Sequence, residues 1–121
     1  MQIYHGASGQ TAVIEGQPAT PLLQSPDDVV ALIGTCFEQG VRAVLLYPDN
    51  LPARFFDLSS GEAGTILQKL RQYHIKLALV EAPGGVPHSP AFQALMREEQ
   101  RGPDFRIFAE RDAALAWLLE A

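Results

Sequence analysis

Residues 55–70 lie in the middle of the chain and have the sequence FFDLSSGEAGTILQKL. In this stretch a polar turn leads into a helical pattern. Apolar residues recur at helical spacing and predict a helix from about Glu62 to Tyr73, with the apolar positions Ala63, Ile66, Leu67, Leu70 and Tyr73, of which Ile66, Leu67 and Leu70 form the buried stripe. Two hydroxyls, at Ser59 and Ser60, precede this helix. They can cap the helix, bind a phosphate, accept a phosphoryl group or take part in catalysis. The Ser59-x-x-Glu62 spacing is typical of a capping box, which favours the cap.

Another helix and two buried strands flank this stretch. The segment SPDDVVALIGTCFEQG, residues 25–40, predicts a helix that Ser25 caps and Gly40 ends. We expect its buried face to hold Val29, Leu32, Ile33, Cys36 and Phe37. The nearly continuous apolar runs VRAVLLYP and IKLALVEA, residues 41–48 and 75–82, are typical of strands covered on both faces.

The two ends of the chain continue the alternation of strands and helices. QIYHG and QTAVIEG predict a hairpin around the Gly-rich turn at residues 6–9, and SPAFQALMREEQRG, DFRIF and ERDAALAWLLEA predict a helix, a strand and a helix. In the last helix we expect Leu115, Trp117 and Leu118 to be the buried anchors. The resulting order, ββαβαβαβα, predicts a single α/β domain over residues 1–121, with a mixed sheet of four or five strands and about four helices.

Composition and charge exclude several classes of function. The chain has 121 residues, of which 47% are hydrophobic, and a formal net charge of −5. The acidic balance argues against nucleic-acid binding and against anionic membrane surfaces, which require a basic face. No apolar run reaches the roughly 18 residues that span a bilayer. Because the N-terminus also lacks a signal-peptide pattern, the expected location is cytoplasmic.

The sequence offers no motif for a metal or a cofactor. His5, His74 and His88 lack ligand spacing and are not accompanied by a pair of cysteines. The nucleotide-binding glycine patterns and the serine-hydrolase elbow are missing. The single cysteine, Cys36, lies on the apolar face of its helix, so we interpret it as a buried small hydrophobe.

The opening stretch, with the closing segment FRIFAERDAALAWLL, resembles the STAS-type domains of anti-sigma-factor antagonists from about residue 25 onward. The resemblance implies a SpoIIAA-like fold and, in phosphorylatable antagonists, a phosphoacceptor directly before the glycine of the turn, which here is Ser60. In this chain Leu58 stands between Asp57 and the two serines.

The combination of FFDLSSGEAGTILQK, YHIKLALV, ExQRG and ALAWL also resembles a bacterial family of domains of unknown function. The pattern of that family has Asn where Gln100 stands, an acidic residue where Thr65 stands, and Lys-Thr where Ser59 and Ser60 stand.

We predict a non-enzymatic binding or regulatory module that acts through a protein partner or self-association. Its expected surface is the loop of residues 49–61 with the start of the following helix, and the candidate residues are Arg54, Phe55, Asp57, Ser59, Ser60 and Gly61. If residues 55–56 are extended, one of Phe55 and Phe56 is buried and the other is an exposed interface anchor.

Two alternatives stay open. One is a small-ligand or hydrolytic site built from Arg54, Asp57, Ser60 and His88, which requires a concave surface that joins them. The other is a homo-oligomeric structural protein, which requires a large apolar patch.

Overall fold

The computed structural model describes residues 2–5, 12–17, 19–56, 61–81, 88–99 and 102–119. These residues form an α/β structure of four helices and a five-stranded sheet, in the order expected from the sequence. The elements are the strands β1 (Gln2–His5), β2 (Ala12–Glu15), β3 (Ala43–Leu46), β4 (Lys76–Val80) and β5 (Phe105–Phe108), the helices α1 (Pro26–Gln39), α2 (Glu62–Gln72), α3 (Pro90–Glu99) and α4 (Arg111–Leu118), and the 3-10 helices η1 (Pro48–Asn50) and η2 (Ala53–Phe56).

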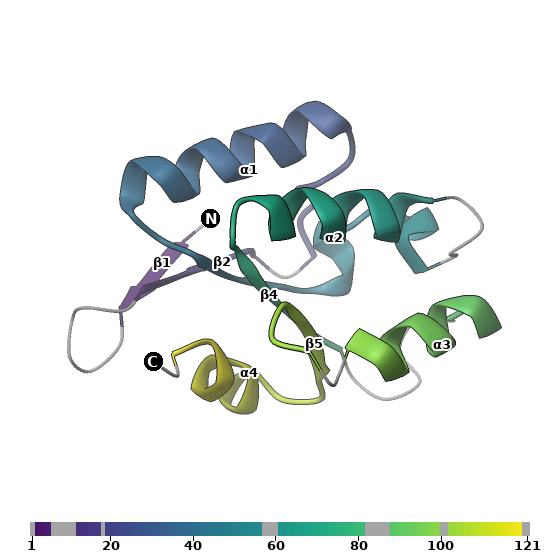
Figure 1. The fold of residues 1–121 in the computed structure, drawn as a ribbon. Helices are drawn as coiled ribbons and strands as arrows, with labels where there is room; N and C mark the ends of the chain where they lie inside the picture. The colour runs from purple at the N-terminus through teal and green to yellow at the C-terminus, as the bar shows by residue number, and fades with distance from the viewer. Residues whose placement is uncertain are drawn as a thin grey trace.

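The strands lie in the sheet in the order in which the chain makes them, β1-β2-β3-β4-β5 (Figure 1). Strand β1 pairs with β2 in antiparallel fashion, which confirms the expected hairpin. The pairings of β2 with β3, β3 with β4, and β4 with β5 are parallel. The carboxyl ends of four strands therefore lie along one edge of the sheet, where α/β proteins usually collect their polar groups.

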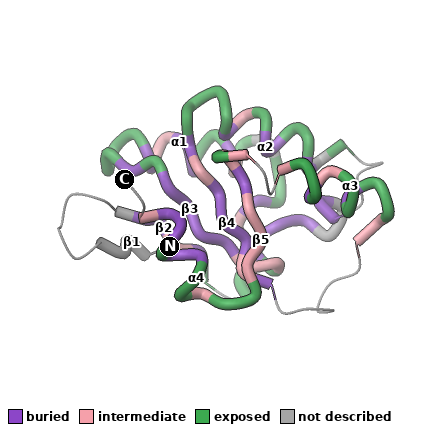
Figure 2. Tube along the Cα trace, turned by 60° about the horizontal axis from the view of Figure 1, so that its bottom comes forward, coloured by how far each residue is buried: buried purple, intermediate pink, exposed green. Residues whose placement is uncertain are grey.

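Helices cover both faces of this sheet. Successive residues of a strand point to opposite faces, so β3 buries Val44 and Leu46 on one side and Ala43 and Leu45 on the other. Of the described helices, α1, α2 and α3 pack on the first face and α4 packs on the second (Figure 1). The strands β3 and β4 are buried almost throughout (Figure 2).

The ends of α1 agree with the sequence prediction. The Ser25 hydroxyl accepts a hydrogen bond from the backbone N–H of Asp28, and the Asp28 carboxylate accepts one from the N–H of Gln24. Gly40 ends the helix with a φ of 66°, a left-handed conformation that favours glycine. The expected anchors of α4 are confirmed too, since Leu115, Trp117 and Leu118 are buried.

The start of α2 corrects one prediction. The helix begins at Glu62, and its N-cap is Gly61, which has a φ of 77° and provides no side-chain cap. A capping box with Ser59 as N-cap would place Glu62 at the third helical position, whereas the structure places it at the first. The predicted capping box is therefore wrong in register.

Two aromatic residues at apolar positions of the predicted helices are exposed. Phe37 of α1 is 65% exposed and Tyr73, which follows α2, is 39% exposed. Their neighbours on the predicted buried faces, such as Cys36 and Leu70, are buried as expected. Helical spacing places both rings beside the buried stripe, but no described element covers the ends of α1 and α2 where they lie.

Candidate functional site

The residues predicted for the binding surface fall partly outside the described structure. Asp57, Ser59 and Ser60 lie outside it, and Arg54 is described only in its backbone, within η2. Gly61 is exposed at the start of α2. The structure therefore does not bring the predicted set together as one described site.

Phe55 and Phe56 are both buried, so the expectation that one of them is exposed is wrong. The segment is a 3-10 helix and not an extended strand, and its rings are 0% and 4% exposed. Phe55 packs edge to face on Phe92 and Phe105, with ring centroids 5.6 and 6.4 Å apart. Phe55 thus belongs to the core beneath the loop.

His88 lies at the carboxyl edge of the sheet, beside this aromatic cluster. Its Nε2 is 2.7 Å from Oε1 of Glu81, which directly follows β4, and its ring stacks on Phe56 with centroids 5.5 Å apart. Glu81 is only 7% exposed. Its other oxygen, Oε2, is buried and bonds to no residue of the described structure. A buried carboxylate with one open oxygen is unusual, because desolvation of such a group costs free energy.

Asn50 connects the two loops that follow β2 and β3. It is completely buried, and its Nδ2 donates to the backbone oxygens of Gln17 and Thr20, each at 2.8 Å. Its Oδ1 accepts from the N–H of Tyr47 at 2.7 Å. A Cβ on Gly16 would lie 2.5 Å from this Oδ1, so the position of Asn50 requires glycine there.

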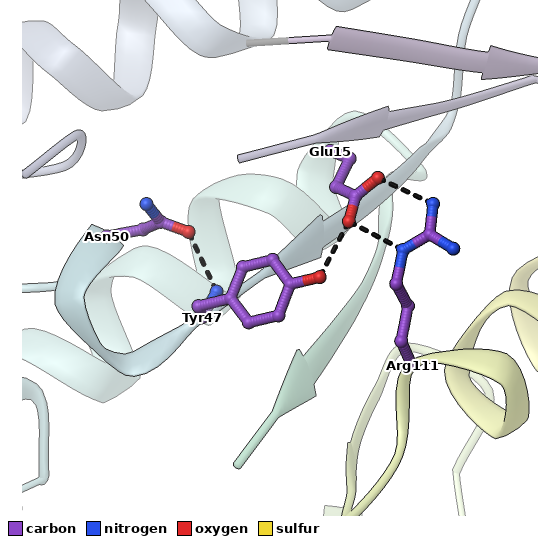
Figure 3. A network of polar contacts seen from close by, with 4 residues as sticks. All are labelled: Glu15, Tyr47, Asn50 and Arg111. Carbon is purple, nitrogen blue, oxygen red and sulfur yellow. Dashed lines mark hydrogen bonds and ion pairs between the residues drawn. The ribbon is translucent and has the colours of Figure 1, made fainter. Parts of the chain in front are cut away.

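A second polar cluster joins β2, β3 and α4 (Figure 3). The Tyr47 hydroxyl donates to Glu15 at 2.6 Å, and the Arg111 guanidinium donates to both carboxylate oxygens of Glu15 at 2.8 and 2.9 Å. Arg111 lowers the pKa of Glu15, against a smaller raising effect of burial, and the Tyr47 hydroxyl lowers it further. Burial, followed by the bond to Glu15, raises the pKa of Tyr47 to about 12. The Glu15 carboxylate is therefore held in its charged form.

The clusters around Asn50 and around Glu15 hold loops together. Each polar group described in these two clusters bonds to another residue of the protein. Sequence reasoning missed Glu15, Tyr47 and Arg111, and it included Asn50 in the predicted loop of residues 49–61 without assigning it a role. The sequence did offer one signal for such residues, which is a polar side chain at the carboxyl end of a strand. Glu15 ends β2 and Tyr47 directly follows β3. The clusters position the carboxyl edge, but they leave no open group that would bind a ligand.

An open apolar surface lies between α1 and α2. Among the described residues, the exposed large hydrophobic side chains are Val30, Phe37 and Tyr73, and all three lie on these two helices or at their ends. The rings of Phe37 and Tyr73 meet edge to face, with centroids 5.6 Å apart. We call this surface, with the hollow at each of its ends, the α1–α2 groove.

The hollows differ in size and are flanked by cations. The first, of about 170 Å³, lies at the amino-terminal ends of the helices and is lined by Val29, Val30, Ile66 and Lys69, among others. The second, of about 260 Å³, lies at their carboxyl-terminal ends, and its lining includes Cys36, Phe37, Val41, Arg42, Tyr73 and Ile75. None of the described residues that line either hollow is acidic.

Other chemistry is sparse in the described part of the chain. No three of its His, Cys, Asp or Glu side chains are grouped so that they could hold a metal ion. No described helix is long and apolar enough to cross a membrane. Burial raises the pKa of the Cys36 thiol to about 11, which keeps it protonated and unreactive.

A family model described as "Domain of unknown function (DUF4180)" matches residues 8–118 of the chain. No curated protein and no solved structure matches the chain significantly. The match confirms the expected relation to a family of unknown function, and it assigns no activity.

Proposed function

The chain belongs to the DUF4180 family, and we propose that it is a non-enzymatic regulatory module that binds a protein partner through the α1–α2 groove. The observation that carries this proposal is the exposed pair of Phe37 and Tyr73, which pack on each other beside a hollow. Exposed aromatic side chains next to a pocket are typical anchors of protein interfaces.

The distribution of apolar residues supports this surface over the others. The described core is otherwise well buried, and the exposed large hydrophobic side chains gather on one surface instead of being scattered. Scattered apolar residues need no explanation, whereas a group of them beside hollows indicates an interaction site. Gly61, the last residue of the predicted surface of residues 49–61, immediately precedes α2, which is one wall of this groove.

A STAS-like relation would explain how the module is regulated. The sheet order and the helix between each pair of successive parallel strands are compatible with it. In this proposal the Ser59-Ser60-Gly61 turn is the switch, since it immediately precedes α2, one wall of the groove. A phosphate on Ser60 would add negative charge close to Asp57 and Glu62 and would change how α2 receives the partner.

The test compares three baits in capture from a lysate of the source organism, with quantitative mass spectrometry. The baits are wild type, the double variant Phe37→Ser/Tyr73→Ser, and Ala116→Ser, a control at an exposed position on α4. We expect wild type and the control to retain the same partner, and the double variant to retain about tenfold less of it, because buried interface anchors carry most of the binding energy. Circular dichroism checks that all three are folded.

Equal retention by the three baits would contradict the groove as the binding surface. Light scattering of the same proteins separates the homo-oligomer alternative. A wild-type dimer that the double variant converts to a monomer would assign the surface to self-association and would overturn the proposed partner. For the switch, Ser60→Glu should reduce retention while Ser60→Ala retains the partner; equal retention by these two variants would reduce Ser60 to a structural role.

A small-ligand site near His88 is the second candidate function. It is favoured by the buried Glu81 carboxylate, whose Oε2 has no partner in the described structure. The predicted residues Arg54, Asp57 and Ser60 belong to the segment that adjoins Phe56, on which His88 stacks. A metabolite that raises the melting temperature of wild type, but not of His88→Phe, would support this site. Equal shifts in both proteins would count against it.

A further inference from the structure

Building on the proposed function, we propose that the partner inserts one amphipathic α-helix with acidic flanks into the α1–α2 groove, and that this helix crosses α1 at Gly34. Three independent features of the groove carry the inference. They are the spacing of its hollows, a glycine that the fold itself does not need, and the charge of its rim.

The spacing of the hollows fits two turns of a helix. The α1 residues at the two hollows, Val30 and Phe37, are seven positions apart, and so are Ile66 and Tyr73 on the other wall. Seven residues of an α-helix rise about 10.5 Å. A partner helix that lies along the groove would therefore place apolar side chains at positions i and i+7 into the two hollows, which is a recognised spacing of helix-in-groove binding.

Gly34 lies between the two hollows on the same stripe of α1. It is four positions after Val30 and three before Phe37, so the three residues are neighbours on the helix surface. Glycine in the middle of a helix is less stable than alanine. Within this chain nothing requires it, since a Cβ on Gly34 would meet no atom within 4 Å and its φ is not positive. A glycine of this kind lets the backbone of another helix approach closely.

The two charged side chains that line the hollows are both cations, although α1 also exposes Asp27 and Glu38 and the protein as a whole carries a charge of −5. Lys69 lines the first hollow and Arg42 the second. Neither forms an ion pair with a residue that the structure describes. An acidic partner would supply the missing charges.

The same charges disfavour a second copy of this chain as the occupant. In a two-fold contact, the groove of one copy faces the groove of the other. Lys69 and Arg42 of both copies would then be brought together, which is repulsive. A partner helix with acidic residues on both sides of its apolar stripe avoids this repulsion.

The test uses synthetic helical peptides of about eighteen residues, long enough to cover both hollows. The first peptide, made of Ala, Glu and Gln, carries Leu and Phe seven positions apart. A second replaces every Glu with Lys, and a third places Leu and Phe five positions apart. Amide shifts of the labelled full-length protein report the binding. We expect the first peptide to shift Val30, Gly34, Phe37, Lys69 and Tyr73, and the other two to bind at least about tenfold more weakly.

A matched pair of variants tests the crossing point. Gly34→Gln places a side chain at the crossing, whereas Gly64→Gln adds the same side chain to α2, where a Cβ also meets no atom within 4 Å. Both variants should fold, and only Gly34→Gln should abolish the shifts caused by the first peptide.

Equal binding of the acidic and basic peptides, or equal effects of the two glycine variants, would overturn the proposed partner chemistry. No binding of the first peptide would overturn it as well. Whether the groove is the partner surface is decided separately, by the capture experiment with Phe37→Ser/Tyr73→Ser.

Discussion

Arg111 and Glu15, 96 positions apart, form a two-pronged ion pair in which Nε and Nη2 of the guanidinium lie 2.8 and 2.9 Å from the two carboxylate oxygens. The pair joins the first residue of α4 to the last residue of β2. Geometry of this kind makes the pair stronger than an ordinary surface ion pair. It therefore holds α4 against its face of the sheet.

The ion pair predicts how stability depends on pH. The folded protein holds the pKa of Glu15 below its ordinary value of 4.5, so the unfolded chain takes up this proton first as the pH falls. The stabilisation is therefore complete above the ordinary pKa and is lost as the pH falls below it. Because Arg111 is half exposed, solvent screens the pair, and we expect Glu15→Gln to cost about 1 kcal/mol at neutral pH.

Urea unfolding from about pH 7 to about pH 3 measures this difference, since the linkage acts only around the carboxylate pKa. The free energies of unfolding of wild type and Glu15→Gln should converge at the acidic end. Two curves that stay parallel over the whole range would refute the role assigned to Glu15.

The close contact between Asn50 and position 16 predicts that the stability effects of substitutions at the two positions are coupled. Asn50→Ala leaves the oxygens of Gln17 and Thr20 and the N–H of Tyr47 without this partner, which should cost about 3 kcal/mol. Gly16→Ala places a methyl group against the Asn50 side chain and should cost about 1–3 kcal/mol. In the double variant the contacts with the Asn50 side chain are gone and only Leu46 Cδ2 remains close, at 3.0 Å, so the cost of Gly16→Ala should be clearly smaller than in the wild-type background. If the two losses of unfolding free energy are additive in a denaturant titration, the clash with Asn50 is not the cause of the cost of Gly16→Ala.

Two glycines of α1 predict opposite effects of the same substitution. Gly34→Ala should stabilise the protein by about 0.5–1 kcal/mol, because it improves helix propensity where a methyl group meets nothing. Gly40→Ala should destabilise it by about 1 kcal/mol, since Gly40 has a φ of 66°. Thermal unfolding of the two variants checks the signs. A stabilising Gly40→Ala would be incompatible with the left-handed end of the helix.

The state of Cys36 predicts its reactivity. The thiol is buried and its pKa is raised to about 11, so an aromatic disulfide reagent should not modify it in the folded protein at slightly alkaline pH. Modification should be rapid once guanidinium chloride unfolds the chain. Fast labelling of the folded protein, followed by absorbance, would show that the first helix opens at this point.

Sequence patterns predicted the features that depend on near neighbours. The ends of α1 were correct because Ser25 and Asp28 are three positions apart, and a helix cap uses groups at that distance. The order of strands and helices was correct because periodicity reports which positions are apolar. Helical spacing could not show that Phe37 and Tyr73 are exposed, because exposure there depends on what covers the ends of two different helices.

The polar clusters could not be predicted in the same way. Asn50 bonds to residues 30 and 33 positions away, and the Arg111 pair spans 96 positions. Such contacts are set by how the sheet brings loops together, which no local pattern specifies. The residues that close the carboxyl edge were therefore absent from the predicted site.

The order of the strands has a consequence for how the protein forms. Every parallel strand pairs with the strand that precedes it in the chain, and in the described structure one α-helix lies between the two. During synthesis, each new strand therefore finds its neighbour already in place, and the loop to be closed stays short. Helix α4 follows the last strand and docks on strands made earlier, so we expect its docking, with the Glu15–Arg111 pair, to be the last step of folding.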